Sequence, residues 1–305
     1  MTTLRSPLSD PPRTSPDHAG TPRPERPRAR IPVRSRIARI TLLTALTVLS
    51  LLWLLPTYLI VVNAFTATDA YDGSANWWIT APDLFGNIAA AFEMASVGQG
   101  MLNSLLYATV SAAAAVLISA AAGFAVIVMP VRHPAVWFWA IYLGTILPLQ
   151  MFLAPLFKAY ASISLYDTQL GMVAVYTAMT IPFAFFVIRN YLTTVPVEMR
   201  EAAALDGAGW AKTFFLIHLP LARSALLAAF VFQFTWVWND LIFGITLSTS
   251  PNIRPVMATL SDLNGNYSTV GPPVALAGAL IASLPTVLLF FIFQRFFVSS
   301  LKLSN

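Results

Sequence analysis

The chain has 305 residues, of which 57% are hydrophobic and only 10% are charged, and its formal net charge is +5. Soluble proteins carry roughly 25% charged residues, so this composition, with a mean hydropathy of +0.70, excludes an ordinary water-soluble domain. There is no cysteine, and the three histidines lie far apart in sequence. The sequence therefore predicts no metal site, no disulfide and no cysteine nucleophile.

The N-terminal segment, residues 1–39, contains eight prolines and nine of the eighteen basic residues. With so few apolar side chains it cannot bury enough surface to offset the conformational entropy of folding, which predicts a disordered basic arm. Basic residues gathered before a first apolar segment are typical of a cytoplasmic tail rather than of a nucleic-acid-binding surface. The apolar stretch after Arg39 stays uncharged until Asp69, which is longer than the core of a cleaved signal peptide, so we expect a retained membrane helix.

Six apolar stretches reach or approach the length of about 20 residues that a helix needs to cross the hydrocarbon core. Continuous apolar runs of this kind exclude the alternating strands of a membrane barrel. The sequence therefore predicts an all-α membrane protein whose transmembrane domain, residues 40–305, has helices at about 40–64, 103–129, 135–157, 168–191, 221–247 and 273–297.

Basic residues also predict the orientation in the cytoplasmic membrane. With the arm in the cytoplasm, sixteen basic residues fall on the cytoplasmic side and only Lys158 and Arg254 fall outside. This distribution follows the positive-inside rule. Six crossings then place both termini in the cytoplasm.

The connection at residues 192–220 is the long cytoplasmic one, and its residues predict local structure. Pro196 suits the first turn of a helix, Glu198 suits the positive end of its dipole, and Gly207 suits its C-terminal end. We therefore predict a short helix, a glycine bend and a second short helix.

Small side chains in the first of these helices favour a docking surface. Ala202 and Ala203 let a partner approach closely, and Glu201 offers a carboxylate to a basic group. The alternative is an amphipathic helix lying among lipid headgroups. That alternative predicts a basic polar face, whereas the charges of this segment sum to a negative one.

The same residues resemble a known family. They match the pattern EAA-x3-G-x9-I-x-L-P, the EAA motif of binding-protein-dependent ABC importer permeases, at Glu201, Ala202, Ala203, Gly207, Ile217, Leu219 and Pro220. The flanking text PVEMREAAALDGA, the upstream LPLQMFLAPLFKAYASISLYDTQLG and the later WNDL resemble the carbohydrate branch typified by the maltose importer.

This resemblance implies a six-helix permease bundle of the type I importer class, without catalytic activity of its own. The 192–220 loop would form a coupling helix that docks into a cytoplasmic ATPase subunit. Glu201 would pair with a basic residue of that subunit, Ala202 and Ala203 would pack against it, and Gly207 would permit the bend. The implied partners are a second homologous permease, two ATPases that bind ATP-Mg, an extracytoplasmic solute-binding protein, a sugar or oligosaccharide, and membrane lipid.

The chain itself contains no nucleotide site, because none of its three lysines follows a glycine as a P-loop requires. Energy must arrive through a partner or through an ion gradient. An ion-coupled carrier of a polar solute therefore remains the alternative. Its main candidate group is Asp240, which we place about 9 Å from the centre of its helix. An intramembrane enzyme would need a Ser–His pair, paired carboxylates or a metal cluster, and the sequence offers none of these.

One face of the predicted fifth helix carries aromatic and polar side chains. Phe232, Trp236 and Asp240 are spaced by four, and Asn239 lies three beyond Trp236, so these residues share a side. Rings suit the C–H faces of a sugar, while amides and carboxylates suit its hydroxyls. We predict that Asn239, Trp236 and Asp240 line a substrate pathway. The alternative places the tryptophan in the aromatic belt and has Asn239 bond a neighbouring helix.

Overall fold

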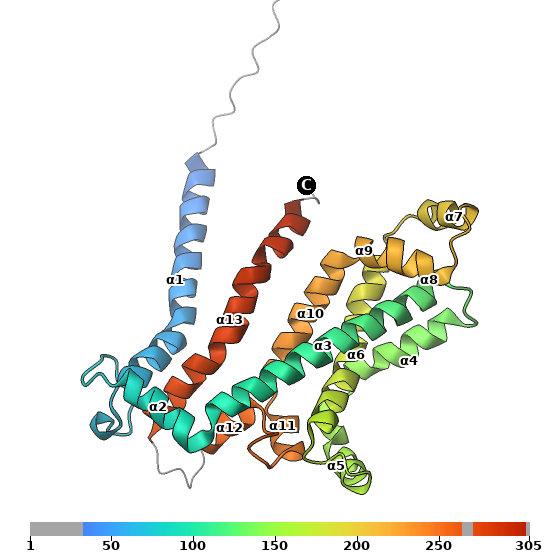
Figure 1. Ribbon diagram of the computed structural model, residues 1–305. Helices are drawn as coiled ribbons and strands as arrows, with labels where there is room; N and C mark the ends of the chain where they lie inside the picture. The colour runs from blue at the N-terminus through green and yellow to red at the C-terminus, as the bar shows by residue number, and fades with distance from the viewer. Residues whose placement is uncertain (1–32, 264–270, 303–305) are drawn as a thin grey trace, which may run out of the picture. The chain divides into compact units, whose positions relative to one another are not determined.

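The computed structural model describes residues 33–263 and 271–302, with side chains over 36–263 and 271–294. These residues are largely helical (Figure 1), and their one β-bridge joins Thr66 to Pro82. The helices are α1 (Val33–Phe65), α2 (Leu84–Ala95), α3 (Val97–Val128), α4 (Pro134–Ile146), α5 (Leu153–Ser162), α6 (Gln169–Leu192), α7 (Val197–Leu205), α8 (Trp210–Thr213), α9 (Leu219–Leu221), α10 (Arg223–Trp238), α11 (Ile242–Leu247), α12 (Val256–Leu263) and α13 (Pro272–Lys302).

The chain divides into two units at Trp53. The first unit contains the N-terminal part of α1, whose described side chains are exposed. The second unit contains everything from Leu54 onward. The helix begins at Val33, inside the segment that the sequence assigned to the arm, and residues 1–32 of that predicted arm lie outside the described residues.

Four of the described helices are long and apolar enough to cross a membrane, and the number rises to six if each of two bent pairs is one span. One bent pair is Pro134–Ile146 with Leu149–Ser162, at 91°, so the predicted continuous helix over 135–157 is wrong. Its break follows from Pro148, because a proline lacks an N–H and pushes the preceding residue into an extended conformation. Leu147 has that conformation.

The predicted continuous helix over 221–247 is also wrong. α10 ends at Trp238 and the chain becomes helical again only at Ile242. The second bent pair lies at the other end of α10, where Trp210–Leu221 and Arg223–Trp238 meet at 73°. The loops that the sequence left without helices contain α2 and α12.

The contact between α3 and α6 is the most extensive of the fold. Ser111 donates its hydroxyl to the carbonyl oxygen of Val173, and Ser119 donates to that of Ile181, both at 3.1 Å. The equal spacing of donors and acceptors shows that the two helices run parallel and in register. Small side chains such as Ala108, Ala112 and Ala115 are fully buried along α3, which lets neighbouring helices approach closely. α10 also packs on α3.

The loop before α12 is held against the start of α3. Tyr107 donates its hydroxyl to the carbonyl oxygen of Ile253 at 2.8 Å. Asn103 donates to the carbonyl oxygen of Arg254 at 2.9 Å, and Ser104 accepts from the N–H of Val256 at 2.8 Å. These bonds satisfy backbone groups that the loop would otherwise leave unpaired.

Asp167 ties the connection between α5 and α6 to the residues that follow α11. Its carboxylate accepts from the N–H groups of Thr249 and Ser250, at 2.8 and 3.0 Å, and from the Ser250 hydroxyl. Burial raises the pKa of Asp167, but these hydrogen bonds outweigh burial and hold the pKa below its usual value. The charged form is therefore the one that the fold stabilises.

Replacing Gly100 by alanine should destabilise the contact between α3 and α12. A Cβ atom there would lie 2.8 Å from Oγ1 of Thr259 and 3.1 Å from Cα of Val256. Overpacking of this kind costs about 1–3 kcal/mol, so we expect a lower Tm for the detergent-solubilised protein. Gly209→Ala is the matched control, because nothing lies within 4 Å of the Cβ position there. Equal Tm values for the two variants would contradict this packing.

Removing the Asp167 carboxylate should lower the free energy of unfolding by on the order of 1 kcal/mol at neutral pH. Its hydrogen bonds to Thr249 and Ser250 are charge-assisted but partly solvated. A carboxyl whose pKa is lower in the folded state stabilises the fold at pH values above its unfolded-state pKa of about 3.9. That stabilisation is lost as the pH falls through the folded-state pKa. The Tm difference between wild type and Asp167→Asn should therefore shrink on acidification. A difference that is the same at acidic and neutral pH would refute the assignment.

Candidate functional site

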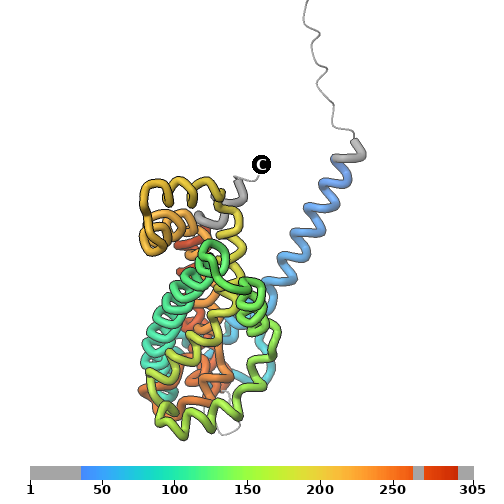
Figure 2. Tube along the Cα trace, turned by 90° about the vertical axis from the view of Figure 1, so that its right-hand side faces the viewer, coloured from blue at the N-terminus to red at the C-terminus, as the bar shows by residue number. Residues whose placement is uncertain are grey.

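One end of the second unit is formed by the segment from α7 to α9, and the opposite end by α5, α11 and α12 (Figures 1 and 2). α7 and the start of α8 expose apolar side chains. Leu205 is 89% exposed, and Val197 and Trp210 are about half exposed. An exposed apolar surface of this kind marks an interaction site or a membrane contact.

Local residues explain how α7 ends. Gly207 has a φ of +71°, the left-handed conformation that glycine adopts without a Cβ penalty. The N–H of Ala208 then bonds the carbonyl oxygen of Ala203 at 2.9 Å, and the N–H of Gly207 bonds that of Ala204 at 3.1 Å. This pair of bonds is the Schellman motif, and it turns the chain back toward α8.

Because the chain turns back after α7, the side chains of the EAA motif differ in their exposure. Glu201 and Ala202 are exposed, whereas Ala203 is 5% exposed and packs within this chain. A partner contact through Ala203 would therefore meet a side chain that the chain already covers. Beside α7 lies a cavity of about 290 Å³ lined by Arg200, Glu201, Ala204, Ala208, Gly209, Trp210 and Thr213.

Behind α7, a single π-helical turn, Phe214–His218, connects α8 to α9. The buried His218 ring packs edge-on against Phe124 of α3, with centroids 5.0 Å apart, and Phe214 packs on the same ring at 5.2 Å. Tyr191 of α6 donates to the carbonyl oxygen of Leu221 at 2.9 Å. This elbow, residues 210–221, is thus fastened to both α3 and α6. The sequence predicted a second short helix here but gave no signal for the aromatic contact.

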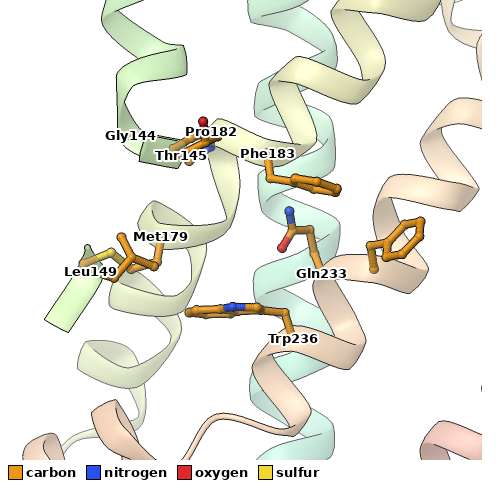
Figure 3. A pocket seen from close by; sticks show the side chains of 9 residues that line it. Gly144, Thr145, Leu149, Met179, Pro182, Phe183, Gln233 and Trp236 are labelled. Carbon is orange, nitrogen blue, oxygen red and sulfur yellow. The ribbon is translucent and has the colours of Figure 1, made fainter. Parts of the chain in front are cut away.

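A second candidate site, the bundle cavity, has a volume of about 450 Å³ and lies between α4, α6 and α10 (Figure 3). It is open on one side, where Phe183, Phe232 and Trp236 are exposed. Trp236, predicted for the substrate pathway, lines it, and Gln233, one turn earlier on α10, lines it as well. Gln233 was not predicted from the sequence, although its spacing of three from Trp236 places both on one side of a helix. The full lining is Gly144, Thr145, Leu149, Met179, Pro182, Phe183, Phe232, Gln233 and Trp236.

The two other predicted pathway residues are not part of this lining. Asn239 is exposed at the end of α10, where its amide donates to the carbonyl oxygen of Thr235 at 2.8 Å. Asp240 accepts from the Tyr176 hydroxyl at 2.9 Å and from the N–H groups of Phe243 and Gly244 at 3.1 Å each. Its carboxylate therefore joins α6 to the start of α11. Among the residues that the structure describes, no group of three His, Asp or Glu could hold a metal ion.

Gly207→Ala should loosen the turn after α7, because a Cβ atom in the left-handed region costs roughly 1–2 kcal/mol. Gly207→Asn should cost less, since asparagine tolerates this conformation. Hydrogen exchange at the amides of Gly207 and Ala208 measures the loss of their bonds. Gly209→Ala, at a φ of −70°, should leave that exchange unchanged. Equal protection in the Gly207→Ala protein and wild type would show that the turn does not depend on glycine.

Comparison with known proteins adds three findings. The family profile described as "Binding-protein-dependent transport system inner membrane component" matches residues 132–303. The chain is 30% identical over 255 residues to the osmoprotective compounds uptake permease protein GgtD of Synechocystis sp., with 81% of this chain and 85% of that protein covered. It is 26% identical over 249 residues to the melibiose/raffinose/stachyose import permease protein MelC of Bacillus subtilis, with coverages of 81% and 89%.

A solved structure has the same fold. It is that of a bacterial ABC transporter involved in the import of the acidic polysaccharide alginate, and it matches with a TM-score of 0.73 and 18% identity over 87% of this chain and 98% of that one. At this level of identity the likeness shows the fold alone.

Proposed function

The chain belongs to the inner membrane components of binding-protein-dependent transport systems, and on that premise we propose that it is the permease subunit of an ATP-driven importer for a sugar or oligosaccharide. Membership makes it a multi-pass membrane protein that works with other transporter components. The saccharide assignment draws on relatives such as MelC, whose name gives melibiose, raffinose and stachyose as its solutes.

The proposed assembly contains a second homologous permease, two cytoplasmic ATPase subunits that bind ATP-Mg, and an extracytoplasmic solute-binding protein. The permease contributes the path through the membrane and no catalysis of its own. The ATPases supply the energy by pulling on the coupling helix α7. The exposed carboxylate of Glu201 is free to meet a basic group of an ATPase, and Ala202 beside it offers a small exposed surface.

The single observation that supports coupling through α7 is the elbow behind it. An exposed helix transmits force only if its base is fixed, and His218 and Tyr191 fix this base to α3 and α6. The elbow also continues directly into α10. A displacement of α7 is thereby applied to the helices that line the bundle cavity.

The proposed orientation puts the α7 end and both termini in the cytoplasm. Four basic residues lie near this end: Arg132 between α3 and α4, Arg200 in α7, Lys212 in α8 and Arg223 at the start of α10 (Figure 1). Lys158 lies on α5 and Arg254 lies just before α12, at the opposite end (Figure 1). The side richer in basic residues is the cytoplasmic one by the positive-inside rule.

An ion-coupled carrier is disfavoured by both the family and the site. The group that such a carrier would use, Asp240, is held by Tyr176 and by the first N–H groups of α11. A carboxylate that fixes a helix start is not free to exchange protons with a transport path.

Glu201→Lys should lower ATP-dependent uptake by at least about tenfold while membrane insertion stays intact. A lysine facing a basic group of the ATPase replaces attraction by like-charge repulsion, which costs several kcal/mol at an interface, and each 1.4 kcal/mol is a factor of ten. Uptake and ATP hydrolysis by the complete transporter in membrane vesicles measure the effect.

Glu198→Lys is the matched control for this variant, because it makes the same charge change at an exposed residue of α7. It should retain most of the uptake. Wild-type uptake by Glu201→Lys, or equal losses in both variants, would contradict a specific role for Glu201.

A further inference from the structure

Gln233 presents a buried polar group that the fold does not use. The side chain is 4% exposed, and its Nε2 atom has no hydrogen-bond partner among the described residues. Buried amides are almost always paired, because an unpaired N–H loses its hydration without compensation. An apolar residue of similar length would pack at this position of α10 without that cost. The amide therefore needs an explanation outside the packing of this chain.

The surroundings of this amide suit a small polar ligand with apolar faces. Figure 3 shows the Gln233 amide between the rings of Phe183 and Trp236. Met179 and Pro182 of α6 complete the apolar wall. The cavity volume of about 450 Å³ lies within the range of roughly 300–1,000 Å³ found for small-molecule sites.

We propose that the aromatic cavity around Gln233 is a saccharide subsite within this subunit, in which the Gln233 amide donates a hydrogen bond to a hydroxyl of the solute as it passes. The proposal rests on the proposed function of the chain. The rings of Trp236 and Phe183 pack on the C–H faces of the sugar. A hydroxyl oxygen supplies the acceptor that the amide lacks.

The lining also selects for a neutral saccharide. None of its nine residues carries a charge. A phosphate or carboxylate that reaches the buried Gln233 amide would lose part of its hydration without a cation to balance its charge, which is more costly than burying a hydroxyl that is hydrogen-bonded. The subsite therefore accepts neutral sugars and disfavours sugar phosphates and uronic acids.

Two other occupants fit the amide less well. A lipid acyl chain would fill the apolar part of the cavity but would leave the amide unpaired. A side chain of the second permease subunit would pair it permanently, and the site would then be an interface rather than a subsite. In that case a Gln233 variant would assemble less well, whereas a variant of a subsite would assemble normally and import less.

The test uses the complete transporter in proteoliposomes, with melibiose and raffinose as neutral probes and glucuronate and sn-glycerol 3-phosphate as anionic probes. We expect ATP-dependent import of a neutral probe. Gln233→Met keeps the length of the side chain and removes the donor, so the sugar imported per ATP hydrolysed should fall about tenfold, the effect of one hydrogen bond at a buried site. Gln150→Met is the matched control, because Gln150 is exposed and lies next to the lining residue Leu149 without lining the cavity.

A second pair of variants tests the rings independently of Gln233. Trp236→Phe keeps an aromatic face and should retain most of the import, whereas Trp236→Leu should lose it. Equal import by these two variants would overturn the stacking role.

Three outcomes would overturn the subsite. The first is import of the anionic probes alone or of no probe. The second is unchanged import per ATP in Gln233→Met. The third is poorer assembly of the complex with unchanged import per assembled complex, which would identify a subunit contact. Failure of the proposed function differs from all three, because it would show as import that depends neither on ATP nor on Glu201.

Discussion

A bilayer offers no water to an unpaired backbone group, so each break in a membrane helix must bring its own hydrogen-bond partners. The break after α10 follows that constraint. After α10 ends, the carboxylate of Asp240 accepts hydrogen bonds from the N–H groups of Phe243 and Gly244, and the Tyr176 hydroxyl of α6 donates to the same oxygen. Near Pro285 of α13, the indole of Trp238 donates to the carbonyl oxygen of Ala282 at 3.0 Å. Asp240 and Trp238 thus bond backbone groups at a helix start or beside a proline, whereas the Nε2 atom of Gln233 has no partner among the described residues.

The same constraint explains the packing of α3 against α6, the frame that positions both candidate sites. The hydroxyls of Ser111 and Ser119 bond carbonyls of α6 without disturbing either helix. α3 then holds the loop before α12 through Tyr107 and the elbow through Phe124. One helix thus carries contacts at both ends of the second unit. α10, which lines the bundle cavity, packs against this frame and is continuous with the elbow.

The sequence predicts well where local chemistry decides and poorly where a distant residue decides. The end of α7 was predictable because a left-handed Gly207 acts within its own turn. The end of α10 was not, because the apolar run continues past it and its break depends on Tyr176, sixty-four positions before Asp240. Pro148 was visible in the sequence, but a proline inside an apolar run is compatible with a kink as well as with a full break.

The candidate sites divide in the same way. The EAA motif pointed to Glu201, Ala202, Ala203 and Gly207. It could not show that Ala203 is buried, because that burial depends on how the chain folds back after Gly207. Just after α10, Asn239 and Asp240 were predicted to line the pathway because they are adjacent polar residues. In the structure Asn239 bonds the last turn of α10 and Asp240 bonds the start of α11. Gln233 stood alone in an apolar stretch. Only the cavity beside it and its missing partner distinguish it from an amide that bonds a neighbouring helix.

The two candidate sites require different polar groups because they lie in different media. On the exposed α7, the charge of Glu201 is solvated, so in the proposed docking it would meet a basic partner at little cost. Within the bundle a charge would be expensive and would hold a solute too tightly for release, whereas one neutral amide discriminates by a single hydrogen bond. An importer subunit must release what it binds in every cycle. A weak donor between two rings meets that requirement better than a carboxylate, and this is a physical reason for the bundle cavity to contain Gln233 while Asp240 is committed to the start of α11.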